Sequence, residues 1–165
     1  MVRRENDFYP TPQSIVDRIV RQFNFVGDVW EPCAGDGRFV EALLPKVPKV
    51  VCGDIATGED FFNCEIAQAA TLVTNPPFKT IRRFIDHAFE IGVTTMVLVC
   101  PERLWACKKG HDQWERHRPT VWANMDWRED YLGKGGSPDR ALAVAYWATP
   151  HAAVCDYQIW GRDDD

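Results

Sequence analysis

The sequence lacks the features that send a protein into or across a membrane. No apolar run approaches the ~18 residues of a transmembrane helix. The N-terminal stretch MVRRENDFYP also lacks the apolar core of a signal peptide. The six cysteines include no Cys-x-x-Cys pair, which favours reduced thiols over a disulfide framework. We therefore expect a cytoplasmic protein that does not interact with membranes.

An excess of positive charge is also lacking. The formal net charge of the 165 residues is −5, and the chain finishes in Arg162-Asp163-Asp164-Asp165. Any surface that binds a polyanion must therefore be local. The hydrophobic content of 45% and the charged content of 26% are ordinary for a globular protein, and the length suits a single domain over residues 1–165.

Motifs for hydrolysis and for metal binding are missing as well. The chain has four histidines and no Ser or Cys nucleophile motif, so the sequence does not support a hydrolase. Cys107, His111 and His117 are residue types that bind zinc, but their spacing matches no four-ligand pattern. We expect no metal site.

What the sequence does contain is an alternation of apolar strands with amphipathic helices. Strands are predicted at 28–32, 49–55, 71–74 and 94–101, and helices at about 12–23, at 39–44 and from Ile81 to Gly92. Continuous apolar strands of this kind are parallel and buried on both faces, so the fold class is α/β with a doubly wound, mostly parallel sheet. The runs 120–127 and 141–148 predict a closing antiparallel hairpin. Only one short element fits between Asp54 and Thr71, so we expect the sheet to be one strand short of larger relatives of this fold.

Acidic residues and glycines follow two of the predicted strands. Glu31 ends the first strand ahead of Gly35 and Gly37, and Asp54 ends the next strand. Ligands of open parallel sheets bind beyond the carboxyl ends of the strands, where glycine lets the backbone approach a ligand closely. Asp54 lies 23 residues after Glu31, near the spacing at which an acid accepts hydrogen bonds from ribose hydroxyls.

Three interpretations of this pattern are open. A dinucleotide site would need a third glycine where the chain has Val40, and Glu31 and Asp36 would repel its pyrophosphate. The same two acids suit a ligand with a positive amino or sulfonium group, such as S-adenosylmethionine. A tight turn without any ligand is the third interpretation.

A stiff turn, TNPPFK (74–79), follows the third predicted strand. Proline fixes its own φ, lacks an N–H and biases the preceding residue toward extended geometry, so this segment carries neither a helix nor a central strand. Such a turn holds an Asn amide, a backbone carbonyl and a Phe ring in a fixed relation. By itself it is also consistent with a plain loop.

Taken in order, these segments resemble the class I S-adenosylmethionine-dependent methyltransferases over nearly the whole chain. The likeness is strongest to the amino-methyltransferases that modify adenine N6 in DNA, in a small form without a target-recognition domain. Their catalytic Asn-Pro-Pro-aromatic signature is matched by Asn75, Pro76, Pro77 and Phe78. The Asn75 oxygen and the Pro76 carbonyl would accept the two N–H groups of the target amine, and the Phe78 ring would stack on a flipped base.

The resemblance also implies a cofactor site for S-adenosyl-L-methionine. The methionine part is expected near residues 7–12, the ribose at Asp54 and the adenine ring at Asp60 and Phe61. The implied cofactor-binding residues are Tyr9, Pro10, Thr11, Glu31, Pro32, Cys33, Gly35, Gly37, Asp54, Asp60, Phe61 and Asn75.

The motif indicates an amine as the methyl acceptor but does not identify the polymer that carries it. We expect nucleic acid, with DNA ahead of RNA, and phosphate contacts from Lys79, Arg82, Lys108, Lys109, Arg116 and Arg118. Four of these residues lie in the Trp-bearing segment 103–118, which is otherwise read as a solvated charged loop. A homodimer or a separate recognition subunit would supply the target recognition. The alternatives are methylation of an RNA base or a glutamine amide, and a non-catalytic subunit of a two-subunit enzyme.

Overall fold

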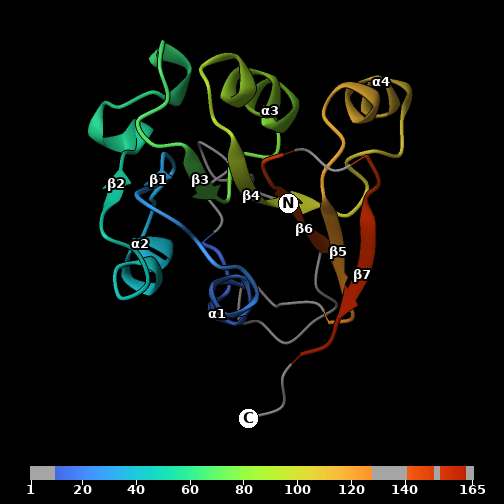
Figure 1. Cartoon of the computed structure of the whole chain (residues 1–165), viewed down its shortest axis with the longest axis horizontal. Helices are drawn as coiled ribbons and strands as arrows, with labels where there is room; N and C mark the ends of the chain where they lie inside the picture. The colour runs from blue at the N-terminus through green and yellow to red at the C-terminus, as the bar shows by residue number, and fades with distance from the viewer. Residues whose placement is uncertain (1–9, 128–140, 151–152, 163–165) are drawn as a thin grey trace, which may run out of the picture.

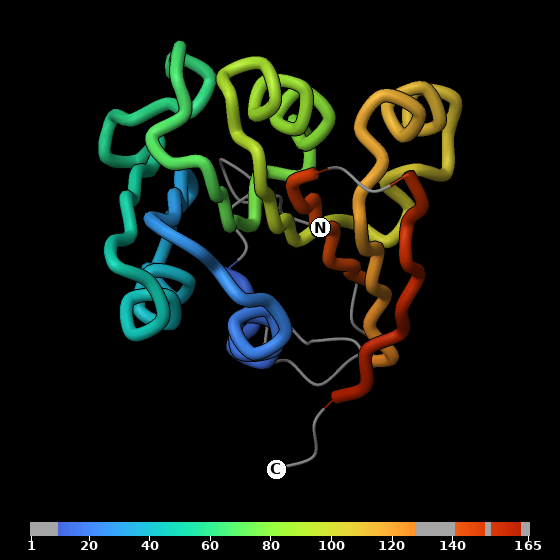
Figure 2. Tube along the Cα trace, in the orientation of Figure 1, coloured from blue at the N-terminus to red at the C-terminus, as the bar shows by residue number. Residues whose placement is uncertain are grey.

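The computed structural model describes residues 10–127, 141–150 and 153–162. Its centre is one sheet with the strand order β2-β1-β3-β4-β6-β5-β7. The strands are β1 (Val29–Glu31), β2 (Val50–Cys52), β3 (Thr71–Thr74), β4 (Thr95–Pro101), β5 (Val121–Met125), β6 (Leu142–Trp147) and β7 (Asp156–Trp160). Of the described strands, only β6 runs against its neighbours, since it pairs antiparallel with both β4 and β5. Figure 2 shows the two edges of the sheet, β2 and β7, on opposite sides of the molecule.

Helices cover both faces of the sheet. In Figure 1, α1 (Gln13–Gln22) and α2 (Arg38–Leu43) lie on one side, and α3 (Ile81–Glu90) and α4 (Lys108–Arg116) on the other. Successive strand residues point to opposite faces, so Val73 packs in the cluster under α1 and Leu72 in the cluster under α3. Phe84 and Ile85 of α3 are almost fully buried. Each such side chain stabilises the fold by roughly 1.5–3 kcal/mol.

These observations confirm the α/β class, the doubly wound sheet and the closing antiparallel pair. Between Asp54 and Thr71 no strand forms; the segment contains two short 3-10 helices, η2 (Ile55–Thr57) and η3 (Phe61–Asn63). The structure adds an edge strand, β7, that was not predicted, so the described sheet has seven strands. None of the described helices is long and apolar enough to cross a membrane.

Candidate active site

The strand order reverses at β1 and β3, and a cavity lies at their carboxyl ends. The chain leaves β1 for β2 on one side and then crosses to β3 on the other, which is the point where open α/β sheets bind ligands. The cavity measures about 570 Å³, within the ~300–1,000 Å³ of small-molecule sites. The predicted site residues in its wall are Pro10, Thr11, Glu31, Pro32, Cys33, Gly35, Asp54, Asp60, Phe61, Asn75, Pro76, Pro77, Phe78 and Lys79.

One predicted cofactor residue is not among the described residues of this wall, and a second is not described by the structure. Gly37 is absent from the lining; it has φ 86° and precedes α2, so it shapes the turn. Tyr9 lies outside the described residues.

The turn between β1 and α2 is held by backbone hydrogen bonds. Gly35 has φ 55°, a left-handed conformation that favours glycine, and its N–H donates to Asp54 Oδ2 at 2.9 Å. The other carboxylate oxygen of Asp54 accepts the N–H of Ala56 at 2.8 Å. Asp54 therefore fixes the glycine turn against the start of η2.

Glu31 is a buried acid in the cavity wall. Its exposed fraction is 1%, and its Oε1 accepts hydrogen bonds from the backbone N–H of Cys33 at 2.9 Å and from the Thr74 hydroxyl. The pKa of Glu31 is raised to about 8: burial is the main cause, the hydrogen bonds from Thr74 and Cys33 oppose it, and the negative charge of Asp54 adds to the rise. Burial also raises the pKa of the Cys33 thiol, so this cysteine is not a nucleophile.

Asp36 does not act as a second free acid, although the sequence suggested one. Its carboxylate forms an ion pair with Nε of Arg38 at 2.9 Å. Nη1 of the same Arg38 donates to the Thr11 carbonyl at 2.8 Å, which ties the start of α1 to the glycine turn. Arg38 and Thr74 were both missed by sequence reasoning. The sequence did hint at both, because Arg38 directly follows Gly37 and Thr74 directly precedes Asn75.

The Asn75–Phe78 turn enters the same cavity from the end of β3. All four of its residues line the wall, and Phe78 is half-buried against both core clusters. The Pro77 carbonyl accepts the backbone N–H of Thr80 at 3.0 Å, which closes the turn just before α3. The turn and the glycine turn thus line the same cavity because they follow the adjacent parallel strands β3 and β1.

Asp60 and Phe61, the residues expected at the adenine ring, both line the cavity but differ in their contacts. Oδ1 of Asp60 accepts the backbone N–H of Phe62 at 2.9 Å. The Phe61 ring stacks on Phe84 at 3.9 Å between centroids and is 5% exposed, so it belongs largely to the core. An adenine contact of Phe61 stays a prediction.

Most of the predicted phosphate-binding residues lie away from the cavity. Lys79 lines it, but no residue of 103–118 does, and neither does Arg82. Arg82 instead donates to the Leu104 carbonyl, Arg116 pairs with Asp86 at 3.3 Å, and Arg118 pairs with Glu115 at 3.2 Å.

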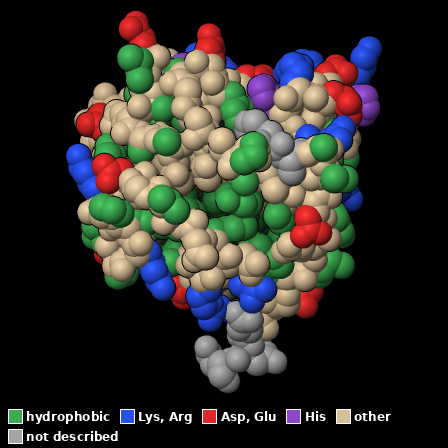
Figure 3. Space-filling model, viewed as in Figure 1, with side chains coloured by type: hydrophobic (Ala, Val, Ile, Leu, Met, Phe, Trp, Pro, Cys, Tyr) green, Lys and Arg blue, Asp and Glu red, His purple; other side chains and the backbone are tan. Residues whose placement is uncertain are grey.

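Lys108 and Lys109 are exposed at the start of α4. On the face shown in Figure 3, charged side chains of both signs alternate around the rim and hydrophobic side chains gather in a central hollow. The described residues of this face thus form no continuous basic patch. Among all residues that the structure describes, no group of three or more His, Cys, Asp or Glu side chains could hold a metal ion.

Comparison with solved structures relates this architecture to known proteins. A protein assigned as a class I S-adenosylmethionine-dependent methyltransferase from Listeria monocytogenes matches with a TM-score of 0.66 and 8% identity, over 93% of this chain and 67% of that chain. The fold is that of the class I S-adenosylmethionine-dependent methyltransferases.

Two further structures share this methyltransferase fold. The methyltransferase subunit of a type I restriction-modification system from Streptococcus thermophilus has a TM-score of 0.61 and 9% identity, over 87% of this chain and 45% of that chain. A protein assigned as an RNA methyltransferase from Pyrococcus horikoshii has a TM-score of 0.60 and 19% identity, over 86% and 85%. The chain therefore spans less than half the length of the Streptococcus subunit. No family model and no curated protein matches the sequence.

Proposed function

We propose that the protein is a cytoplasmic S-adenosylmethionine-dependent N-methyltransferase whose acceptor is the exocyclic N6 amino group of adenine in DNA. One observation carries this proposal. The glycine turn with Glu31 and Asp54, and the Asn75-Pro76-Pro77-Phe78 turn, line a single cavity of about 570 Å³ in a methyltransferase fold.

The residues of the cavity fit the cofactor. Asp54 retains lone pairs for ribose hydroxyls, because each carboxylate oxygen has accepted only one hydrogen bond. Asp60 supplies negative charge, and Glu31 adds to it when ionised, which suits a ligand with positive amino and sulfonium groups. Arg38 lines the cavity beside Thr11, where a guanidinium suits the methionine carboxylate. When bound, S-adenosylmethionine supplies an electrophilic methyl group.

At the acceptor side the protein positions a weak nucleophile. An exocyclic amine donates its lone pair into the ring, so it reacts only when that lone pair is turned out of the plane. The Asn75 side-chain oxygen and the Pro76 carbonyl would accept its two N–H groups and favour the pyramidal nitrogen. The prolines fix both acceptors before the amine arrives, and Phe78 offers a stacking face for the base.

DNA is the favoured polymer because the Asn-Pro-Pro-Phe signature resembles adenine N6 methyltransferases and because restriction-modification subunits share the fold. RNA is the second candidate. The Pyrococcus protein assigned as an RNA methyltransferase has nearly the same length as this chain. Lys79 is the basic residue best placed to contact a phosphate near the target. Since residues 103–118 do not line the cavity, a second copy or a separate subunit is expected to recognise the target sequence.

The direct test is methyl transfer from methyl-labelled S-adenosylmethionine to DNA, RNA and protein in parallel reactions. The proposal predicts label on DNA, recovered as N6-methyladenine after hydrolysis to nucleosides. Label only on RNA would select the second candidate. Label on no polymer, with cofactor binding intact, would contradict both.

A further inference from the structure

Glu31 is a buried carboxyl group that has no cationic partner among the described residues. Both of its hydrogen bonds end on Oε1, and among the described residues none reaches Oε2. No lysine or arginine of the described chain forms an ion pair with it. A carboxylate in such a place pays a desolvation cost that two neutral donors offset only in part.

The other charges around the cavity do not help Glu31 to ionise. The acids in its wall, Asp36, Asp54, Glu59 and Asp60, add negative potential, and the Cys33 thiol stays neutral. Among the described residues, the wall contains two cations, Arg38 and Lys79, and Arg38 is engaged with Asp36 and Thr11. Lys79 follows the Asn75–Phe78 turn in the same wall and forms no ion pair with Glu31. In agreement with this geometry, the pKa of Glu31 is raised to about 8.

We infer that the Glu31 carboxyl is neutral in the ligand-free protein and ionises when the positive end of the cofactor enters the cavity. This inference rests on the proposed function. The carboxyl O–H bond breaks, the proton passes to the solvent, and the ligand's positive charge balances the new negative charge. The step involves no oxidation or reduction. Cofactor affinity therefore rises with pH below about pH 8, by up to about tenfold per pH unit for one linked proton.

The Thr74 hydroxyl extends this effect toward the acceptor. It donates to Glu31 Oε1, and Thr74 directly precedes Asn75. A hydrogen bond to a carboxylate is roughly twice as strong as one to a neutral acceptor. Ionisation of Glu31 thus tightens the end of β3 at the moment when the cofactor is present.

Calorimetric titrations at pH 7 in buffers of different ionisation enthalpy measure the protons released on binding. The ligands are S-adenosylmethionine, S-adenosylhomocysteine and 5′-methylthioadenosine, which carry, respectively, both cations, the ammonium only, and neither. The ligand amino group itself titrates near pH 8. The decisive quantity is therefore the release by the parent protein minus the release by Glu31→Gln. We expect about one proton for S-adenosylmethionine and almost none for 5′-methylthioadenosine.

Release with S-adenosylhomocysteine that equals the S-adenosylmethionine value would identify the ammonium as the trigger, and a much smaller value would identify the sulfonium. Equal proton release by the parent protein and Glu31→Gln would overturn the inference. If neither protein binds S-adenosylmethionine, the proposed function falls and the inference falls with it.

Thr74→Val supplies a second test that leaves the carboxyl in place. Because the Thr74 hydrogen bond lowers the pKa of Glu31, its loss should displace the rise in cofactor affinity to higher pH. An affinity profile that superimposes on the parent profile would contradict the inference even if Glu31→Gln fails to fold.

Discussion

Asp54 has a structural task and a proposed binding task in one carboxylate. Its oxygens accept the N–H groups of Gly35 and Ala56 at 2.9 and 2.8 Å, which sets the shape of the glycine turn. The remaining lone pairs are the acceptors proposed for the ribose. Both tasks depend on its position one residue beyond Gly53, where β2 has ended.

Replacing Asp54 by Ala should weaken S-adenosylmethionine binding about ten- to a hundredfold, because charged hydrogen bonds worth roughly 1.5–3 kcal/mol are lost. Calorimetry on the purified variant gives this value. Asp28→Ala is the matched control, since Asp28 is exposed at the opposite end of β1. Equal affinities of the two variants would mean that the ribose acid has been misassigned.

The raised pKa of Glu31 should also make the free energy of unfolding depend on pH. The unfolded chain releases the Glu31 proton near pH 4.5, whereas the folded protein retains it to about pH 8. The contribution of Glu31 is therefore fully present below pH 4.5 and is lost as the pH rises to about 8, by at most ~1.4 kcal/mol per pH unit. Urea unfolding at pH 5, 6, 7 and 8 should show a shallower decline for Glu31→Gln. Parallel declines would contradict the raised pKa.

At the scale of elements, α4 shows where sequence periodicity fails. Its sequence KKGHDQWER has no apolar stripe, and its buried residues are Gly110 and Gln113. A Cβ at Gly110 would lie 2.8 Å from the Leu104 carbonyl oxygen, so close backbone packing replaces apolar side chains. β7 was missed for a related reason, because an edge strand with exposed Tyr157 and Ile159 carries little burial pattern.

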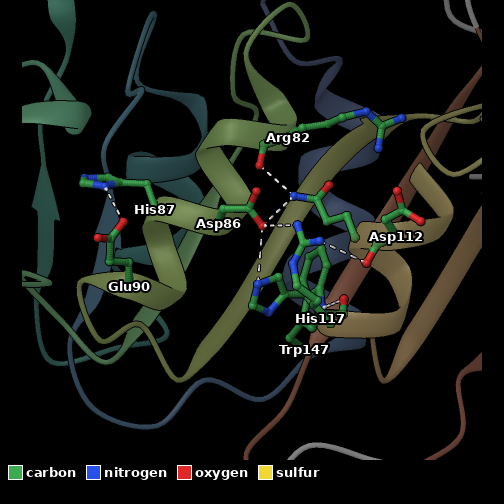
Figure 4. A network of polar contacts seen from close by, with 9 residues as sticks. Arg82, Asp86, His87, Glu90, Asp112, His117 and Trp147 are labelled. Atoms are coloured by element: carbon green, nitrogen blue, oxygen red, sulfur yellow. Dashed lines mark hydrogen bonds and ion pairs between the residues drawn. The ribbon is translucent and has the colours of Figure 1, made fainter. Parts of the chain in front are cut away.

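Polar contacts join α4 to α3 (Figure 4). The buried Gln113 amide donates to the Arg82 carbonyl at 2.7 Å and to Asp86 Oδ1 at 3.0 Å. The same Asp86 oxygen lies 3.3 Å from Arg116 Nη2 and 3.4 Å from His117 Nε2. α4 is therefore held by a buried amide and a shared carboxylate.

Gln113→Ala should lower the free energy of unfolding by about 1–3 kcal/mol, because a buried carbonyl and a carboxylate lose their donor. The exposed Arg116 provides the control: Arg116→Ala should cost less than about 1 kcal/mol. Urea midpoints compare the two. A larger loss for Arg116→Ala would show that the exposed ion pair, and not the amide, holds α4.

At the scale of the whole molecule, the sequence predicted the central parallel strands and the cavity that they form. The reason is physical: buried parallel strands leave continuous apolar runs, and their carboxyl ends must share one edge. What could not be predicted is pairing between distant polar groups. The Thr74–Glu31 hydrogen bond joins residues 43 positions apart, and the Arg82–Leu104 hydrogen bond engages a residue that was predicted to bind phosphate.

The central claim is that the cavity transfers a methyl group to an amine held by the Asn75 turn. Single-turnover methylation of DNA by Asn75→Ala, with cofactor affinity measured alongside, tests it most directly. The account predicts a rate ~10²–10³ lower with cofactor binding unchanged, because one preorganised acceptor acts mainly in the transition state. Methyl transfer by Asn75→Ala at the parent rate would contradict the account.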